Sequence, residues 1–123
     1  MASVKWSFSS LKDFVTCPRQ YYEVKIAQNY TKTVSTQMAY GTAVHKALED
    51  YVRDQVPLPK NYTQYQRYVD PLLEVDGERY TEYQMALDAN KVPCDFKSPD
   101  YWVRGIADLL IVSGDTAFIV DYK

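Results

Sequence analysis

Residues 102–123 of the chain read WVRGIADLLIVSGDTAFIVDYK, and this stretch decides the fold. Runs of β-branched and aromatic residues lie on either side of a Ser-Gly-Asp-Thr turn at 113–116. This pattern predicts an antiparallel hairpin whose two loop residues are the central Gly and Asp. Counting outward from such a turn places Asp108 directly opposite Asp121. The hairpin therefore brings two carboxylates together in an otherwise apolar ribbon.

A third charge joins this pair, because side chains alternate along a strand and Lys123 shares the face of Asp121. Like charges directly opposite each other destabilise a sheet. Lys123 could compensate them in a buried ion-pair cluster. Alternatively, the carboxylates could bind a divalent metal ion, with the lysine beside the reacting group. Both interpretations remain open on the hairpin alone.

Composition is that of a globular protein of 123 residues, with 46% apolar and 24% charged residues. The net charge of −2 excludes a strongly basic nucleic-acid binder. No run approaches the length of a membrane span, and no signal-peptide core is present, so we expect a cytoplasmic protein without a membrane partner. Two cysteines, Cys17 and Cys94, do not suggest a disulfide framework.

The strongest helical pattern spans residues 37–55, where apolar residues recur every three or four positions and His45 lies one turn from both Gly41 and Glu49. Weaker patterns predict a short helix through Leu11, Phe14 and Val15, which begins at a cap within residues 7–10 and is interrupted at Pro18. Further helices are predicted at 18–26 and from Asn61, and the latter bends or ends near Pro71. The apolar positions of the main helix are Ala43 or Val44, Ala47, Leu48, Tyr51 and Val52.

Residues 79–88 alternate as a strand does, with Tyr83, Met85 and Leu87 on one face and Glu82 on the more polar face. A helical part (1–75) followed by a three-strand antiparallel meander (76–123) predicts an α/β (α+β) fold with helices packed on the sheet. We expect one domain over 1–123. Because the chain stops on a strand residue, we expect the domain to be partial, without the C-terminal part of its core.

Several of these features occur together in one known family. Gly41-x-x-x-His45, Glu82, Gly105-x-x-Asp108 and Asp121-Tyr122-Lys123 resemble, in order, the motifs of the PD-(D/E)xK nuclease superfamily, and in particular its RecB/Cas4-like exonuclease branch. Residues 9–22, SSLKDFVTCPRQYY, are also similar to the N-terminal signature of that branch. The resemblance covers nearly the whole chain.

The resemblance implies a restriction-endonuclease-like core and a metal-dependent DNA nuclease, in particular an exonuclease of phage or bacterial replication, recombination or repair. In such an enzyme Asp108 and Asp121 would bind Mg²⁺ or Mn²⁺, with His45 as a third ligand. Lys123 would orient the attacking water and stabilise charge on the phosphate. Glu82 could be a further ligand, a charge at the sheet edge or a partner of Arg104.

Cys17 matches the first iron–sulfur ligand of some relatives, but the other three ligands would lie beyond Lys123. We therefore expect a buried structural thiol and no cluster in this chain. Gly41 and Gly105 are expected to allow close packing. The expected partners are DNA ends or single strands, and possible further partners are other replication or recombination proteins.

Two other functions compete with the nuclease. One is a catalytically incomplete nuclease-like domain that binds nucleic acid or protein. The other is a small structural domain in which the Asp-Asp-Lys cluster is only an ion pair. Since buried ion pairs stabilise little relative to apolar replacements, the last alternative gives no strong reason for the cluster.

Overall fold

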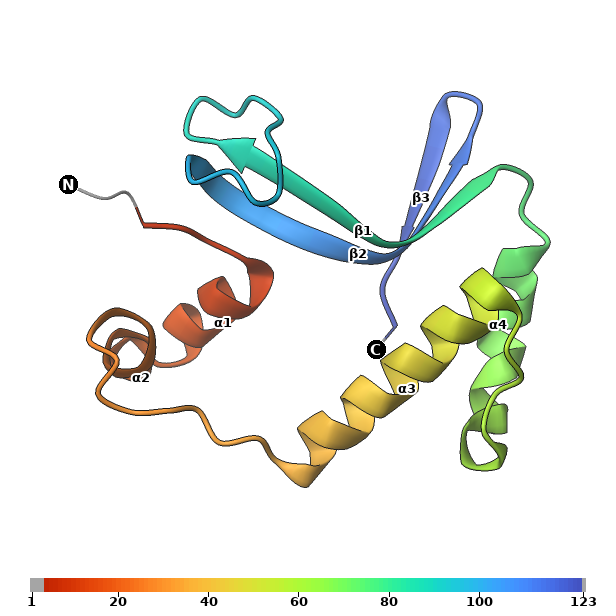
Figure 1. Ribbon diagram of the computed structural model, residues 1–123, viewed down its shortest axis with the longest axis horizontal. Coiled ribbons are helices and arrows are strands. Elements are labelled where there is room, and N and C mark those ends of the chain that lie inside the picture. Colours follow the sequence, from red (N-terminus) through yellow and green to blue (C-terminus); the bar gives the residue numbers. More distant parts are fainter. Residues whose placement is uncertain (1–3, 123) are drawn as a thin grey trace. The chain divides into compact units, whose positions relative to one another are not determined.

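The computed structural model describes residues 4–122 and contains four α-helices, two shorter helical turns and three strands (Figure 1). The strands form one antiparallel sheet in the order β1-β2-β3, which confirms the predicted α+β class. The elements are α1 (Phe8–Thr16), α2 (Pro18–Tyr21), the π-helical turn η1 (Tyr22–Ile26), α3 (Thr36–Asp54), the 3₁₀ turn η2 (Lys60–Tyr65), α4 (Gln66–Leu73), β1 (Glu78–Asp88), β2 (Tyr101–Ser113) and β3 (Thr116–Val120).

The chain divides into two compact units, each made of two segments of sequence. Unit 1 contains residues 1–34 and 84–106, and unit 2 contains residues 35–83 and 107–123. The long strands β1 and β2 contribute to both units. The single domain expected over 1–123 stays a prediction.

Unit 1 is held by an aromatic cluster and by one short backbone pairing. Trp6 stacks on the ring of Tyr21 at 5.6 Å between centroids, and Phe14 lies edge-on to both. The backbone N–H of Trp6 donates to the carbonyl of Trp102 at 2.8 Å, which adds the N-terminal segment to the edge of β2. Of the cap positions expected within residues 7–10, α1 uses Ser7, which forms a capping box with Ser10.

Unit 2 contains the main hydrophobic core. α3 follows the predicted stripe, and its residues Val44, Leu48 and Val52 are buried. They pack with two fully buried residues of β2, Leu109 and Ile111, whose side chains point to the same face because they are two positions apart. Leu58 and Val69 complete the buried cluster.

The hairpin has the predicted turn and register. Ser113 pairs with Thr116, and the ladder runs to Leu109 opposite Val120. Gly114, the first loop residue, has a φ of 60°, a conformation that glycine adopts without strain. The ladder extends as far as Leu109 and Val120, so Asp108 and Asp121 lie one step beyond it and Asp121 is the first residue after β3.

Gly77 shows the one close backbone approach that requires a glycine. Its φ is 136°, and a Cβ atom at this position would lie 2.3 Å from the carbonyl oxygen of Val112. The glycine therefore lets the chain enter β1 in contact with the backbone of β2.

Two sequence-based interpretations are wrong. A Cβ at Gly41 or Gly105 would meet nothing within 4 Å, so neither glycine serves close packing. In β1, the buried residue is Ala86, whereas Tyr83 and Met85 are more than a third exposed. The predicted apolar face of this strand is thus not its buried face.

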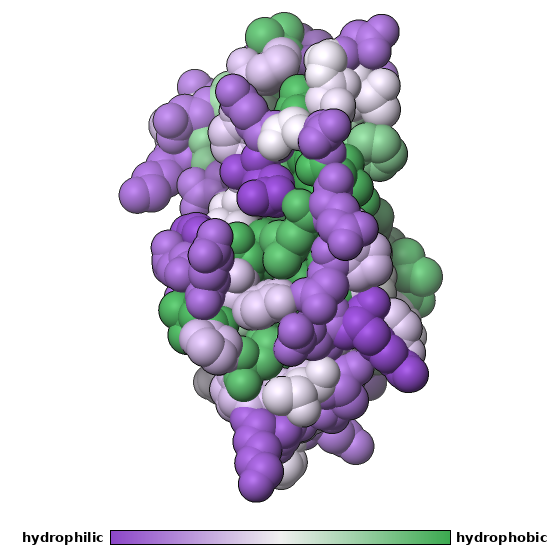
Figure 2. Space-filling model, turned by 90° about the vertical axis from the view of Figure 1, so that its right-hand side faces the viewer, coloured by the Kyte–Doolittle hydropathy of each residue, from purple (hydrophilic) through white to green (hydrophobic). Residues whose placement is uncertain are grey.

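Exposed apolar side chains remain on the surface of unit 2. Figure 2 views the side of the molecule where α4 lies and shows hydrophobic atoms in the middle of this face, between hydrophilic side chains. Val56, Tyr68 and Ile119 are among the exposed large hydrophobic residues of the unit. Scattered exposure of this kind is ordinary for a small protein.

Candidate active site

Three predicted site residues reach one place in unit 2. Asp108 lies in β2, Asp121 directly follows β3, and His45 lies in the middle of α3. Figure 1 shows the chain beyond β3 turning toward α3. The ring of Tyr122 lies edge-on to the ring of His45, with 5.8 Å between the centroids. The helix histidine and the end of the hairpin therefore meet.

Asp108 is the centre of this arrangement, and both of its carboxylate oxygens have partners. Oδ2 accepts a hydrogen bond of 2.8 Å from the backbone N–H of Tyr122. Oδ1 faces Nδ1 of His45 at 3.6 Å, which is an electrostatic contact but too long for a hydrogen bond. The side chain of Asp108 also hydrogen-bonds to that of Asp121.

Burial raises the pKa of Asp108 above its ordinary value, and the hydrogen bond and negative charge of Asp121 raise it further. The N–H of Tyr122 and the nearby His45 act in the opposite direction, since both favour the carboxylate. The acid pair therefore holds negative charge less readily than two separate aspartates do. A cation at this place would relieve that repulsion.

Two glutamates extend the negative charge. Glu82 is exposed, but the neighbouring chain partly removes water from its carboxyl group, which raises its pKa, and the charges of Glu49 and Asp108 raise it further. The backbone of Glu82 has a φ of 51°, which is uncommon for a residue other than glycine and interrupts the regular course of β1. Glu49 lies one turn after His45 on α3, and its carboxylate forms an ion pair with the guanidinium of Arg53 at 2.5 Å.

The sequence analysis did not assign two residues of this place to the site, Glu49 and Tyr122. Burial raises the pKa of Tyr122 to about 12, and the charges of Asp108, Glu82 and Glu49 add to the effect. Its hydroxyl is buried without a hydrogen-bond partner among the described residues. The signal for Tyr122 was its place between the two charged residues of the Asp-x-Lys motif. For Glu49 it was the spacing of one helical turn from His45.

Other predicted residues lie elsewhere or are not described. Lys123 is outside the described residues. Arg104, the possible partner of Glu82, belongs to unit 1, where its guanidinium lies over the rings of Phe96 and Tyr101. Cys17 is half-buried and has a free thiol. Within residues 4–122, no group of three or more His, Cys, Asp or Glu side chains is close enough to hold a metal ion.

A comparison with models of protein families identifies the family of the chain. The model of the PD-(D/E)XK nuclease superfamily matches residues 5–87, a range that includes His45 and Glu82. The chain belongs to this superfamily. The match ends before β2 and does not include Asp108 or Asp121. Searches of curated proteins and of solved structures gave no match.

Membership of the PD-(D/E)XK superfamily indicates a nuclease and a nucleic-acid substrate. Nucleases of this superfamily generally use divalent metal ions. None of the helices in the described part of the chain is long and apolar enough to cross a membrane.

Proposed function

We propose that the chain is a metal-dependent deoxyribonuclease with exonuclease activity of the RecB/Cas4-like kind, in DNA replication, recombination or repair. Its centre is formed by Asp108, Asp121 and His45. The observation that carries the proposal is the position of Asp108, which contacts both an imidazole from α3 and a second carboxyl group from the end of the hairpin.

The donor atoms suit a divalent cation. Carboxylate oxygens are hard ligands, and Mg²⁺ is commonly held by only one or two of them, with water and substrate phosphate completing its shell. The imidazole of His45 would make Mn²⁺ a good substitute. Asp108, Asp121 and His45 would hold the ion, which would supply a Lewis acid for the phosphate and lower the pKa of bound water.

The reaction joins a water oxygen to phosphorus and breaks one P–O ester bond. Glu82, whose raised pKa lets it hold a proton more readily than an ordinary glutamate, lies near Asp108 and is suited to accept the proton from water. Lys123 would bring positive charge to the phosphate oxygens. The backbone N–H of Tyr122 keeps the carboxylate of Asp108 in a fixed orientation throughout.

The test is release of nucleotides from end-labelled DNA in Mg²⁺ or Mn²⁺. Asp108→Asn keeps the acceptor for Tyr122 but removes a charge, so we expect at least a hundredfold loss of cleavage, the order of a catalytic acid–base or charge-stabilising contact. Asp115→Asn, an exposed carboxylate in the turn of the same hairpin, is the matched control and should cleave normally.

Calorimetric titration with Mn²⁺ separates the remaining possibilities. Binding that Asp108→Asn weakens, together with cleavage, supports the proposal. Binding without cleavage would replace it with the non-catalytic module. If Mn²⁺ binds wild type and Asp108→Asn equally, or neither of them, the assigned centre is wrong.

A further inference from the structure

Unit 1 contains an open groove that the proposed centre does not use. It has a volume of about 650 Å³ and is formed entirely by residues 17–33. One side comes from the helical residues of α2 and η1, and the other from the extended segment that follows them. All of these residues belong to the first sequence segment of unit 1, so the groove is built within that unit.

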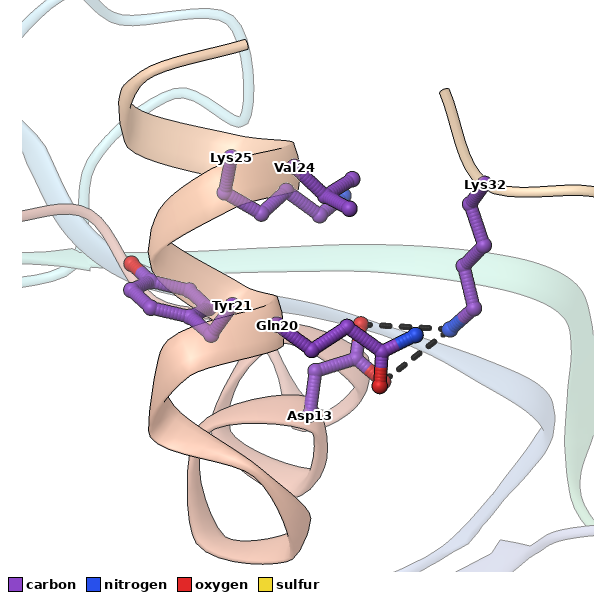
Figure 3. Close-up of a pocket in the computed structure, with 6 residues that line it drawn as sticks. All are labelled: Asp13, Gln20, Tyr21, Val24, Lys25 and Lys32. Carbon is purple, nitrogen blue, oxygen red and sulfur yellow. Dashed lines mark hydrogen bonds and ion pairs between the residues drawn. The ribbon is translucent and has the colours of Figure 1, made fainter. Parts of the chain in front are cut away.

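An ion pair ties the extended side of the groove to α1. The ammonium of Lys32 contacts both carboxylate oxygens of Asp13 on α1, at 3.0 and 3.2 Å. Figure 3 shows this contact beside Gln20, which also lines the groove. The extended segment that contains Lys32 is thereby tied to the helices. The groove is therefore a defined feature of the fold.

Arg19 supplies an available positive charge at the groove. Its side chain is exposed, and among the described residues no carboxylate forms an ion pair with it. Glu23, the acidic residue of the lining, accepts a hydrogen bond of 2.8 Å from Asn29. A planar guanidinium without a protein partner is well suited to a phosphate group.

Tyr30 supplies an aromatic surface at the same groove. The residue is 69% exposed, and its ring stacks on no other ring within the described part of the chain. Large exposed rings beside positive charge are the usual means by which proteins hold unpaired bases. Thr31 and Thr33 add hydroxyl groups that can donate to phosphate oxygens.

The charge of this part of the chain has the sign that such a ligand needs. Residues 1–34 contain five Lys or Arg and two Asp or Glu, whereas the whole chain has a net charge of −2. The positive charge is therefore concentrated in the segment that forms the groove. Local positive charge of this kind attracts a polyanion even when the protein as a whole is acidic.

We propose that this groove binds single-stranded DNA, with Arg19 on a phosphate and a base stacked on Tyr30. The proposal deepens the proposed function by naming the form of the substrate, and it rests on that function for the assignment of DNA. Single strands fit because stacking on Tyr30 requires an unpaired base, whereas in a duplex the faces of the bases are covered.

The experiment measures fluorescence anisotropy of a labelled oligothymidylate of about 12 nucleotides, within the usual range of single-strand sites, in a metal-free buffer with chelator. Tyr30→Ala should weaken binding about tenfold, since stacking contributes on the order of 1–3 kcal/mol per base, and Tyr30→Phe should restore it. Arg19→Gln should weaken binding and lower the dependence of log K on log salt by about 0.7.

Matched controls are on unit 2. Tyr68→Ala removes another exposed tyrosine, and Lys60→Gln removes another exposed cation. Both should bind the oligonucleotide as wild type does. Equal binding by Tyr30→Ala and wild type would overturn the proposal. So would equal affinity for a duplex of the same length, because that result would indicate contacts to phosphates alone.

The two proposals fail in different ways. Asp108→Asn should bind the single strand normally and cleave poorly. If this variant cleaves as wild type does, the catalytic centre is wrong and the groove is unaffected. If Tyr30→Ala and Arg19→Gln bind normally while Asp108→Asn has lost cleavage, the groove is wrong and the nuclease proposal stands.

Discussion

At the scale of single residues, Asp108 links the stability of unit 2 to its charge. Burial and the neighbouring Asp121 raise the pKa of Asp108 in the folded chain. A group whose pKa is higher in the folded state binds its proton more tightly there. Its stabilising contribution is complete below the unfolded pKa of about 4 and is lost as pH rises through the folded pKa.

We therefore predict that Asp108→Asn raises the melting temperature at about pH 7 in the presence of a chelator, and that the gain disappears below about pH 4, where the wild-type acid is protonated. The asparagine still accepts the hydrogen bond from Tyr122. Circular dichroism during heating, over a pH series, measures the effect. Asp115→Asn should show no such gain. A wild-type protein that is the more stable of the two at neutral pH would contradict the prediction.

At the scale of elements, Gly77 and Gly41 give opposite predictions for the same substitution. Gly77→Ala puts a Cβ 2.3 Å from the carbonyl oxygen of Val112 at a φ of 136°, so the entry of β1 must shift. We expect a loss of more than about 2 kcal/mol in the free energy of unfolding. Gly41→Ala meets open space inside α3 and should gain roughly 0.5–1 kcal/mol. Urea denaturation measures both, and a stabilised Gly77→Ala would refute the close approach.

The two glycines also show what a sequence can and cannot predict. The helix 37–55 and the hairpin register followed from periodicity and turn length, which are local properties, and both are confirmed. The roles of Gly41 and Gly105 depended on which other segment approaches them, and those predictions were wrong. The close approach at Gly77 involves Val112, a residue distant in sequence, and no local pattern indicates it.

In the candidate site, too, some residues could be predicted from local spacing and others depend on packing. Asp108 and Asp121 were brought together by counting from a turn, and the hydrogen bond between them agrees with that count. Tyr122 was passed over because its buried ring depends on how the chain leaves β3 and meets α3. Such a contact is a property of packing rather than of sequence spacing.

At the scale of the whole molecule, the chain has two candidate binding places that lie in different compact units. The acid pair with His45 belongs to unit 2, and the groove with Arg19 and Tyr30 belongs to unit 1. A ligand that binds only the folded state stabilises the segment that it contacts and slows local opening there. Each ligand should therefore leave its own footprint in amide hydrogen exchange.

We predict that Mn²⁺ slows exchange around His45, Asp108 and Tyr122, and that a single-stranded oligonucleotide, added with chelator, slows exchange within residues 17–33. Mass spectrometry of peptic fragments measures both patterns. Asp108→Asn should erase only the footprint of the metal, and Tyr30→Ala only that of the strand, because each variant removes contacts within one unit. A strand footprint confined to the peptides of unit 2 would mean that the acidic centre alone meets DNA, and the groove would then have no part in binding it.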